Sequence, residues 1–145
     1  MSGIMEKNLK LMQTLDDAWN NQDWETFKKR HAEKVAVYWP GQPEPTIGRE
    51  EHFKESKEFF ETFDNRLVNN PYKVLFGQGK YTCSIADWSA TMIGPIKMPD
   101  GKVIQPTHKT AKLDFCTVAT WANSEIVEEK LFYDQVGFMK QLGIM

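Results

Sequence analysis

The chain has 145 residues, of which 41% are hydrophobic and 26% charged, and its formal net charge at pH 7 is −2. This length and composition predict one domain over residues 1–145 with a real hydrophobic core. The charge provides no basic field for nucleic acid or an anionic membrane, and no segment approaches the length of an apolar membrane span. The first residues also lack the apolar stretch of a signal peptide, so we expect a cytoplasmic protein.

The N-terminal part of the chain has helical periodicity. Residues 5–20 carry apolar side chains at helical spacing, and Asp23 then offers an N-cap for a second, short helix. A first strand ends at Pro40-Gly41, and a third helix is expected over residues 49–63.

After residue 64 the hydrophobic period changes from 3.6 to 2. Strands are expected at 66–69, 72–77, 80–93, 107–121 and 125–134, followed by a short apolar tail. Helices followed by a long antiparallel meander predict an α+β fold. The two longest strands must curve strongly within one small sheet. We therefore expect a conical barrel, in which N-terminal helices cover a strongly curved, mostly antiparallel sheet around an interior cavity.

Two alternating sets of residues run through the last expected strand. The first is Ile126, Glu128, Lys130, Phe132 and Asp134, and the second is Val127, Glu129, Leu131 and Tyr133. The second set is typical of a face packed on protein. The first combines apolar bulk with three ionisable groups, as a pocket wall does, and makes Asp134 the first candidate for chemistry. The alternative is that the charged members lie on a solvated face, where ion pairs contribute only tenths of a kcal/mol.

Three stretches of the sequence resemble one known family. They are AWNNQDWETFKKRHAEKVAVYWPG, IGREEHFKESKEFFETFDN and IVEEKLFYDQVGFMKQLG. They are similar to the SnoaL-like polyketide cyclases, also called predicted ester cyclases, in the superfamily named for nuclear transport factor two. The resemblance implies the conical α+β fold, a dimer or tetramer formed through the open sheet face, and chemistry without a cofactor. Characterised cyclases close a polyketide ring by intramolecular aldol condensation, with a carboxylate as acid/base in an apolar pocket.

The resemblance assigns the acid/base role to Asp134, the Asp of the terminal D-x-x-G-x-x-x-Q-L-G pattern. An aldol or isomerase reaction also needs a hydrogen-bond donor near the developing enolate oxygen, which His108 or Trp88 could supply. The expected substrate-binding residues are Trp39, Trp88, Glu128 and Phe132. A surface-loop position is the alternative for His108, and the hydrophobic core is the alternative for the two tryptophans.

The remaining expectations concern partners. We expect an enzyme of the lyase or isomerase type that acts on an apolar or aromatic carbonyl compound, and no nucleic-acid or membrane partner. No His/Cys cluster has zinc spacing, so no metal is expected. Cys83 and Cys116 could be bridged if their strands are neighbours, although free thiols suit a reducing compartment better. Long strands with an uncovered apolar face predict a homodimer through 80–93 and 107–121. The alternatives are a non-catalytic small-molecule binding module and a dimeric interaction domain.

Overall fold

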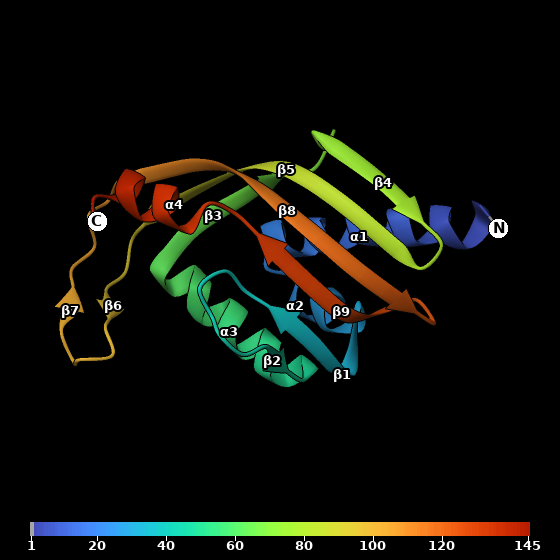
Figure 1. Cartoon of the computed structure of the whole chain (residues 1–145), viewed down its shortest axis with the longest axis horizontal. Coiled ribbons are helices and arrows are strands. Elements are labelled where there is room, and N and C mark those ends of the chain that lie inside the picture. The colour runs from blue at the N-terminus through green and yellow to red at the C-terminus, as the bar shows by residue number, and fades with distance from the viewer. Residues whose placement is uncertain (1) are drawn as a thin grey trace.

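The computed structural model describes residues 2–145 and shows a mixed α+β fold with four helices and a large curved sheet (Figure 1). The helices are α1 (Ser2–Asn21), α2 (Trp24–Lys29), α3 (Arg49–Thr62) and α4 (Gln135–Leu142). The strands of the large sheet are β1 (His31–Tyr38), β2 (Thr46–Ile47), β3 (Phe63–Val68), β4 (Val74–Gln78), β5 (Tyr81–Met92), β8 (Thr110–Ala122) and β9 (Glu125–Phe132). A separate small hairpin consists of β6 (Ile96–Lys97) and β7 (Val103–Ile104).

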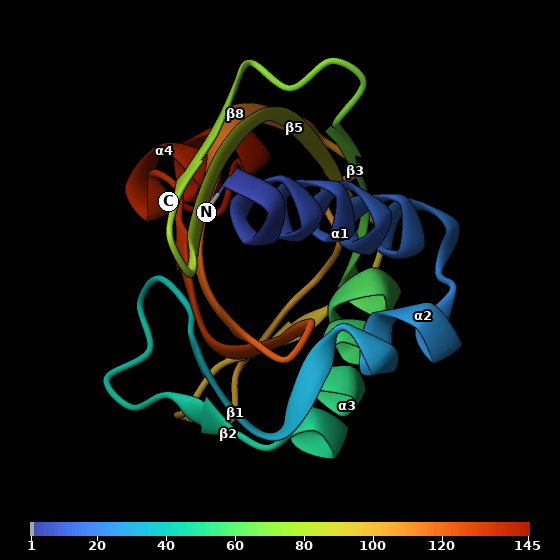
Figure 2. The same cartoon turned by 90° about the vertical axis from the view of Figure 1, so that its right-hand side faces the viewer.

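The large sheet is strongly curved but open. Its strand order is β2-β1-β9-β8-β5-β3, and β4 pairs with the other half of the β5 edge. All pairs are antiparallel except β1 with β9, so the expected α+β class and mostly antiparallel sheet are confirmed. The strands do not close into a barrel, because β2 and β3, at the two ends of the strand order, do not pair with each other. Helices α1, α2 and α3 lie across the open side instead and cover the concave face (Figure 2).

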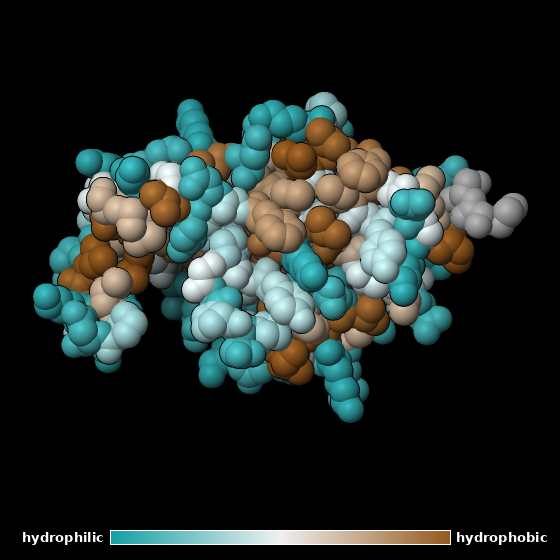
Figure 3. Space-filling view, in the orientation of Figure 1, coloured by the Kyte–Doolittle hydropathy of each residue, from teal (hydrophilic) through white to brown (hydrophobic). Residues whose placement is uncertain are grey.

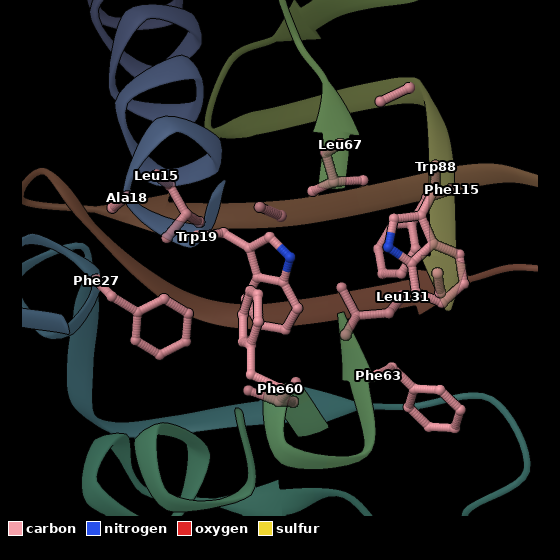
Figure 4. Close-up of a cluster of buried hydrophobic side chains, with 14 of the residues drawn as sticks. Leu15, Ala18, Trp19, Phe27, Phe60, Phe63, Leu67, Trp88, Phe115 and Leu131 are labelled. Atoms are coloured by element: carbon pink, nitrogen blue, oxygen red, sulfur yellow. The ribbon is translucent and has the colours of Figure 1, made fainter. Parts of the chain in front are cut away.

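The expected helices are present because their signals are local. The Asp23 side chain accepts a hydrogen bond from the backbone N–H of Thr26 at 3.2 Å and caps α2, as expected. Helix α1 buries Met12, Leu15 and Ala18 against the sheet, which is the face that its apolar spacing predicts. Large apolar side chains from helices and strands meet in one core between the two layers (Figure 4).

The C-terminal end differs from the expectation. Strand β9 ends at Phe132, and the expected tail is the helix α4. The Asp134 side chain caps this helix by accepting a hydrogen bond from the Gly137 N–H at 2.9 Å. Gly143 ends the helix in the left-handed conformation, with φ of 78°. Both capping signals were present in the sequence, but the run of alternating residues before them favoured a longer strand.

A bulge in β9 decides which side chains of this strand face the protein interior, and it makes the expected pocket wall wrong. On β8, Thr120 and Trp121 are consecutive, whereas their partners on β9 are Glu128 and Ile126, so Val127 is an extra residue without a partner opposite. An extra residue shifts all later side chains to the other face. Glu129 and Leu131 are therefore buried. The residues expected to form the pocket wall point outward instead: Lys130, Phe132 and Asp134 are exposed, and Glu128 is half-buried.

The convex face of the sheet carries apolar side chains toward solvent (Figure 3). Exposed members include Val74, Phe76 and Tyr81 on the β4 and β5 strands. Cys83 and Cys116 lie on this face on neighbouring strands, with their sulfur atoms 4.0 Å apart and not bonded. Among residues 2–145, none of the helices is both long and apolar enough to cross a bilayer.

Candidate functional site

An inner cavity of about 40 Å³ lies between the concave face of the sheet and helices α1 and α3. Its walls are mostly aliphatic and aromatic, with four polar members. The lining residues are Leu15, Asp16, Trp19, Phe27, Trp39, His52, Leu67, Trp88, Phe115, Thr117, Glu129 and Leu131. The volume suits a water molecule or the reacting end of a larger molecule.

A buried group of two histidines and a carboxylate lies beside the cavity, and His52 and Glu129 of this group line it. Glu129, which is 4% exposed, comes from β9 just beyond the bulge. Its Oε1 lies 3.1 Å from Nε2 of His31, at the start of β1, and 3.3 Å from Nε2 of His52, on α3. The parallel pairing of β1 with β9 and the placement of α3 over this pair therefore bring together residues from three distant parts of the sequence.

The outer nitrogen of each histidine also has a hydrogen-bond partner. His31 Nδ1 donates to the carbonyl oxygen of Phe27 at 2.7 Å, because a carbonyl can only accept. His52 Nδ1 lies 2.8 Å from Glu55 Oε2, which also accepts a hydrogen bond from the Trp39 indole N–H at 2.7 Å. Both rings are thus held in fixed orientations, with their Nε2 atoms turned to Glu129.

Burial and pairing shift the pKa values of this group in opposite directions. For Glu129, burial favours the neutral acid, but His31 and His52 outweigh it and hold the pKa of the carboxyl well below its usual range. For His52, burial alone would lower the pKa, but hydrogen bonds with Glu129 and Glu55 raise it above the usual value. Glu129 and His52 are therefore a buried ion pair in the cavity wall.

Asp16 is a second buried carboxyl group in the same cavity. It lies on α1, is 6% exposed, and accepts a hydrogen bond from the Tyr72 hydroxyl at 2.6 Å. Burial raises the pKa of Asp16 to about 7, with smaller contributions from the negative charges of Glu129 and Asp17, although the Tyr72 hydrogen bond opposes the change. Asp16 is thus poised to give or take a proton near neutral pH.

Two tryptophans of the aromatic wall are fixed by one amide. Asn65 Oδ1 accepts hydrogen bonds from the indole N–H of Trp19 at 2.7 Å and of Trp88 at 3.1 Å. The Asn65 side chain is buried and donates to the Phe63 carbonyl. The shape of this wall is therefore defined by hydrogen bonds as well as by packing.

A larger outer pocket of about 510 Å³ adjoins the cavity at Trp39, which lines both. It lies between α3, α4 and the β6–β7 hairpin, which stands away from the body of the protein (Figure 1). Phe59 packs against Trp39 with 5.5 Å between ring centroids and against Trp88 with 6.1 Å. Trp39 borders both spaces, Phe59 borders the outer pocket and Trp88 borders the inner cavity, so the three rings lie where the two spaces meet.

The residues that the sequence singled out are spread over both sides of the sheet. Trp39 and Trp88 line the inner cavity. Phe132 is 51% exposed, and Glu128 pairs with the exposed Lys130 at 3.8 Å.

The two expected catalytic residues lie outside the inner cavity and the outer pocket. His108 is exposed in the loop before β8, with φ of 59°. Asp134 is exposed and caps α4, so its expected position in the cavity is wrong. The catalytic roles of both residues stay predictions, now without the cavity geometry on which they depended.

Sequence reasoning missed Asp16, His52 and Glu129. Helical spacing alone could have indicated two of them. Asp16 is four residues after Met12 on the buried face of α1, and His52 is four residues before Ser56 on the buried face of α3. Glu129 required knowledge of the bulge at Val127, which no short sequence pattern gives.

Comparisons with known proteins agree with this architecture. The family model for the SnoaL-like polyketide cyclase matches residues 9–142. A search of curated proteins gave no significant sequence match.

Several solved structures share the fold at low sequence identity. A protein from Jannaschia sp. CCS1, described as a SnoaL-like polyketide cyclase, has a TM-score of 0.86 at 18% identity. The match covers 100% of this chain and 97% of that protein's chain. IdmH of Streptomyces antibioticus, described as a polyketide cyclase, has a TM-score of 0.75 at 19% identity, with 94% and 98% covered. An LEH-like epoxide hydrolase from M. tuberculosis has a TM-score of 0.74 at 9% identity, with 95% and 90% covered. These likenesses show the fold, and the family model matches nearly the whole sequence. The chain therefore belongs to the SnoaL-like polyketide cyclase family.

Proposed function

We propose that the protein is a small-molecule enzyme that moves a proton next to a carbonyl group, with Asp16 as its acid/base residue. The observation that carries the proposal is the inner cavity, in which a buried carboxyl group with a pKa of about 7 faces the same small space as the His52–Glu129 ion pair. A cavity lined only by apolar groups would favour a binding module instead, and two carboxyl groups in one aromatic cavity favour chemistry.

The first step of an aldol cyclisation or an isomerisation is the same. A carboxylate takes a proton from the carbon next to the carbonyl group, and a donor stabilises the negative charge that develops on the oxygen. Ionised Asp16 suits the first role, because a base with a pKa near neutrality is effective at neutral pH. His52 suits the second, because its Nε2 is 3.3 Å from Glu129, a long hydrogen bond that a substrate oxygen can replace.

The two cavities suggest how a substrate would be divided between them. The outer pocket has the volume of a small-molecule site and aromatic walls formed by Phe59, Phe63 and Phe138. The inner cavity accepts only a few atoms. We therefore place the apolar body of the substrate in the outer pocket, and its carbonyl end passes the Trp39–Phe59 contact to reach Asp16. Binding requires these two rings to move apart.

The family resemblance and the convex sheet face support a homodimer. Val74, Phe76 and Tyr81 expose apolar surface there, and a second copy of the same face would cover it. Sedimentation velocity at micromolar concentration tests this, and a monomeric mass would contradict it.

The catalytic proposal is tested by hydrogen exchange at carbon. Wild-type protein is incubated in D₂O with aryl 1,3-diketones and aryl ketones, and loss of the proton next to the carbonyl is followed by NMR. We expect exchange above the buffer rate for at least one compound, and a loss of at least about 100-fold in Asp16→Asn, the usual scale of a general-base contribution.

Asp64→Asn is the matched control, because it removes an exposed carboxyl group on β3 that lines neither the inner cavity nor the outer pocket. It should retain wild-type exchange. Equal exchange by wild type and Asp16→Asn would refute the assignment of Asp16, and the absence of exchange with every compound would refute the proposed reaction.

A further inference from the structure

Three atoms that can act as metal ligands converge beside the inner cavity, and each imidazole Nε2 offers its lone pair when the proton between it and Glu129 leaves. They are Nε2 of His31, Nε2 of His52 and a carboxylate oxygen of Glu129, and all three lie within 4.8 Å of one another. We propose that these residues form a binding site for a divalent transition-metal ion of the Zn²⁺ type. Imidazole nitrogen and carboxylate oxygen are the ligands that such ions prefer, and two histidines with one glutamate form a known type of zinc ligand set.

The two distances from Glu129 to the histidines suit an ion with tetrahedral geometry. Bonds of about 2.1 Å place neighbouring ligand atoms about 3.4 Å apart around a tetrahedral zinc ion. The Glu129 Oε1 atom is 3.1 Å from His31 Nε2 and 3.3 Å from His52 Nε2. An ion can therefore enter with shifts of a few tenths of an ångström at these two contacts, and the two Nε2 atoms, which lie within 4.8 Å of each other, have to take up the same spacing.

The outer contacts of both histidines prepare them as ligands. A histidine that binds a metal through Nε2 commonly donates its Nδ1–H to a carbonyl or a carboxylate, which fixes the ring. His31 donates Nδ1–H to the Phe27 carbonyl, and His52 Nδ1 faces the Glu55 carboxylate. Glu55 is itself held by hydrogen bonds from Trp39 and Thr46. This second layer is already complete in the structure.

Charge balance favours the same conclusion. Each histidine directs its Nδ1–H away from Glu129. For both Nε2 atoms to donate hydrogen bonds to the Glu129 carboxylate, each of them must carry a second ring proton, which makes each imidazole positively charged. The two carboxylates, Glu55 and Glu129, balance two positive charges in either case. One divalent ion therefore supplies the charge of two protons without adding net charge to the protein interior.

The site has a free side toward the cavity. His52 and Glu129 line the inner cavity, so a water molecule or a substrate oxygen there can provide the fourth ligand. An ion in this place would act as a Lewis acid beside Asp16, and it would stabilise a substrate oxygen in place of the His52 Nε2–H, which an ion bound at that nitrogen replaces. The inference does not depend on the proposed reaction, because ion binding is measured without a substrate.

The proposed site departs from the expectation that no metal binds. That expectation considered only ligands close together in the sequence, whereas 98 residues separate His31 from Glu129.

The test uses untagged protein, so that no added histidines bind the ion. After treatment with EDTA and removal of the chelator, the protein is titrated with Co²⁺, and visible d–d absorption is recorded. We expect one Co²⁺ per chain, the strong bands of a four- or five-coordinate site, and displacement of the ion by Zn²⁺. X-ray absorption of the Zn²⁺-loaded wild type should show nitrogen and oxygen ligands with scattering from two imidazoles.

The three histidines of the sequence allow a matched control. His52→Gln and His31→Gln should each weaken Co²⁺ binding by at least about 100-fold, because losing an outer partner of a ligand already costs about 10- to 100-fold. His108→Gln removes the exposed histidine and should bind as wild type does. The absence of Co²⁺ absorption in the wild type would overturn the proposal, as would a single imidazole in the X-ray absorption spectrum or loss of binding in His108→Gln alone. The wild-type measurements decide the matter even if a buried variant does not fold.

Discussion

Asp16 should make the stability of the protein fall as pH rises, and one substitution should remove this effect. The pKa of the carboxyl group is about 7 in the folded protein, against an ordinary value of 3.8 that applies to the unfolded chain. The folded state therefore keeps a proton that the unfolded chain has already lost. The stabilisation from this proton is fully present below about pH 4 and is lost as pH rises through about 7.

The size of this change in stability follows from the difference between the folded and unfolded pKa values of Asp16. Each pH unit in this window is worth about 1.4 kcal/mol, so the complete change is about 4 kcal/mol. Asp16→Asn has nearly the same shape, carries no charge at any pH, and can still accept the hydrogen bond from Tyr72. The variant should therefore gain stability relative to wild type as pH increases.

The assay is urea unfolding of both proteins at pH values from about 5 to about 8, where the difference in unfolding free energy should grow by about 3 kcal/mol. All other titrating groups occur in both proteins, so most of their contributions cancel in the difference. Asp134→Asn controls for the loss of one negative charge at an exposed position. A difference between wild type and Asp16→Asn that stays constant with pH, or that shrinks, would refute the reasoning about burial.

Three further predictions concern the contacts around the cavity and at the C-terminal helix. Glu129→Gln leaves two buried histidines without their carboxylate and should lower the unfolding free energy by about 3–5 kcal/mol, as measured in urea. Asn65→Leu leaves the buried N–H groups of Trp19 and Trp88 without an acceptor. It should lower the melting temperature, with a loss of about 1–3 kcal/mol for each group. Asp134→Ala removes the N-cap of α4 and should cost about 1 kcal/mol, and a variant that loses much more would contradict a purely capping role.

The sequence was sufficient for features that depend on neighbouring residues. Helical spacing predicted the buried face of α1, and a single Asp predicted the cap of α2, because both act over three or four residues. The change to alternating residues predicted the antiparallel meander, and the long strands predicted its curvature. The resemblance to the SnoaL-like family came from stretches spread over nearly the whole chain, and the family model confirms it.

The site depended on contacts between distant residues. Glu129 contacts His31 because β1 pairs in parallel with β9, so that the first and last strands in the sequence lie side by side. It points inward only because Val127 forms a bulge, and one inserted residue exchanges the two faces of a strand. The same insertion turns Lys130 and Phe132 outward. The sequence by itself thus determined the three N-terminal helices and the main strands. Pairing and register, which arise only when the sheet assembles, decided which ionisable groups face the cavity.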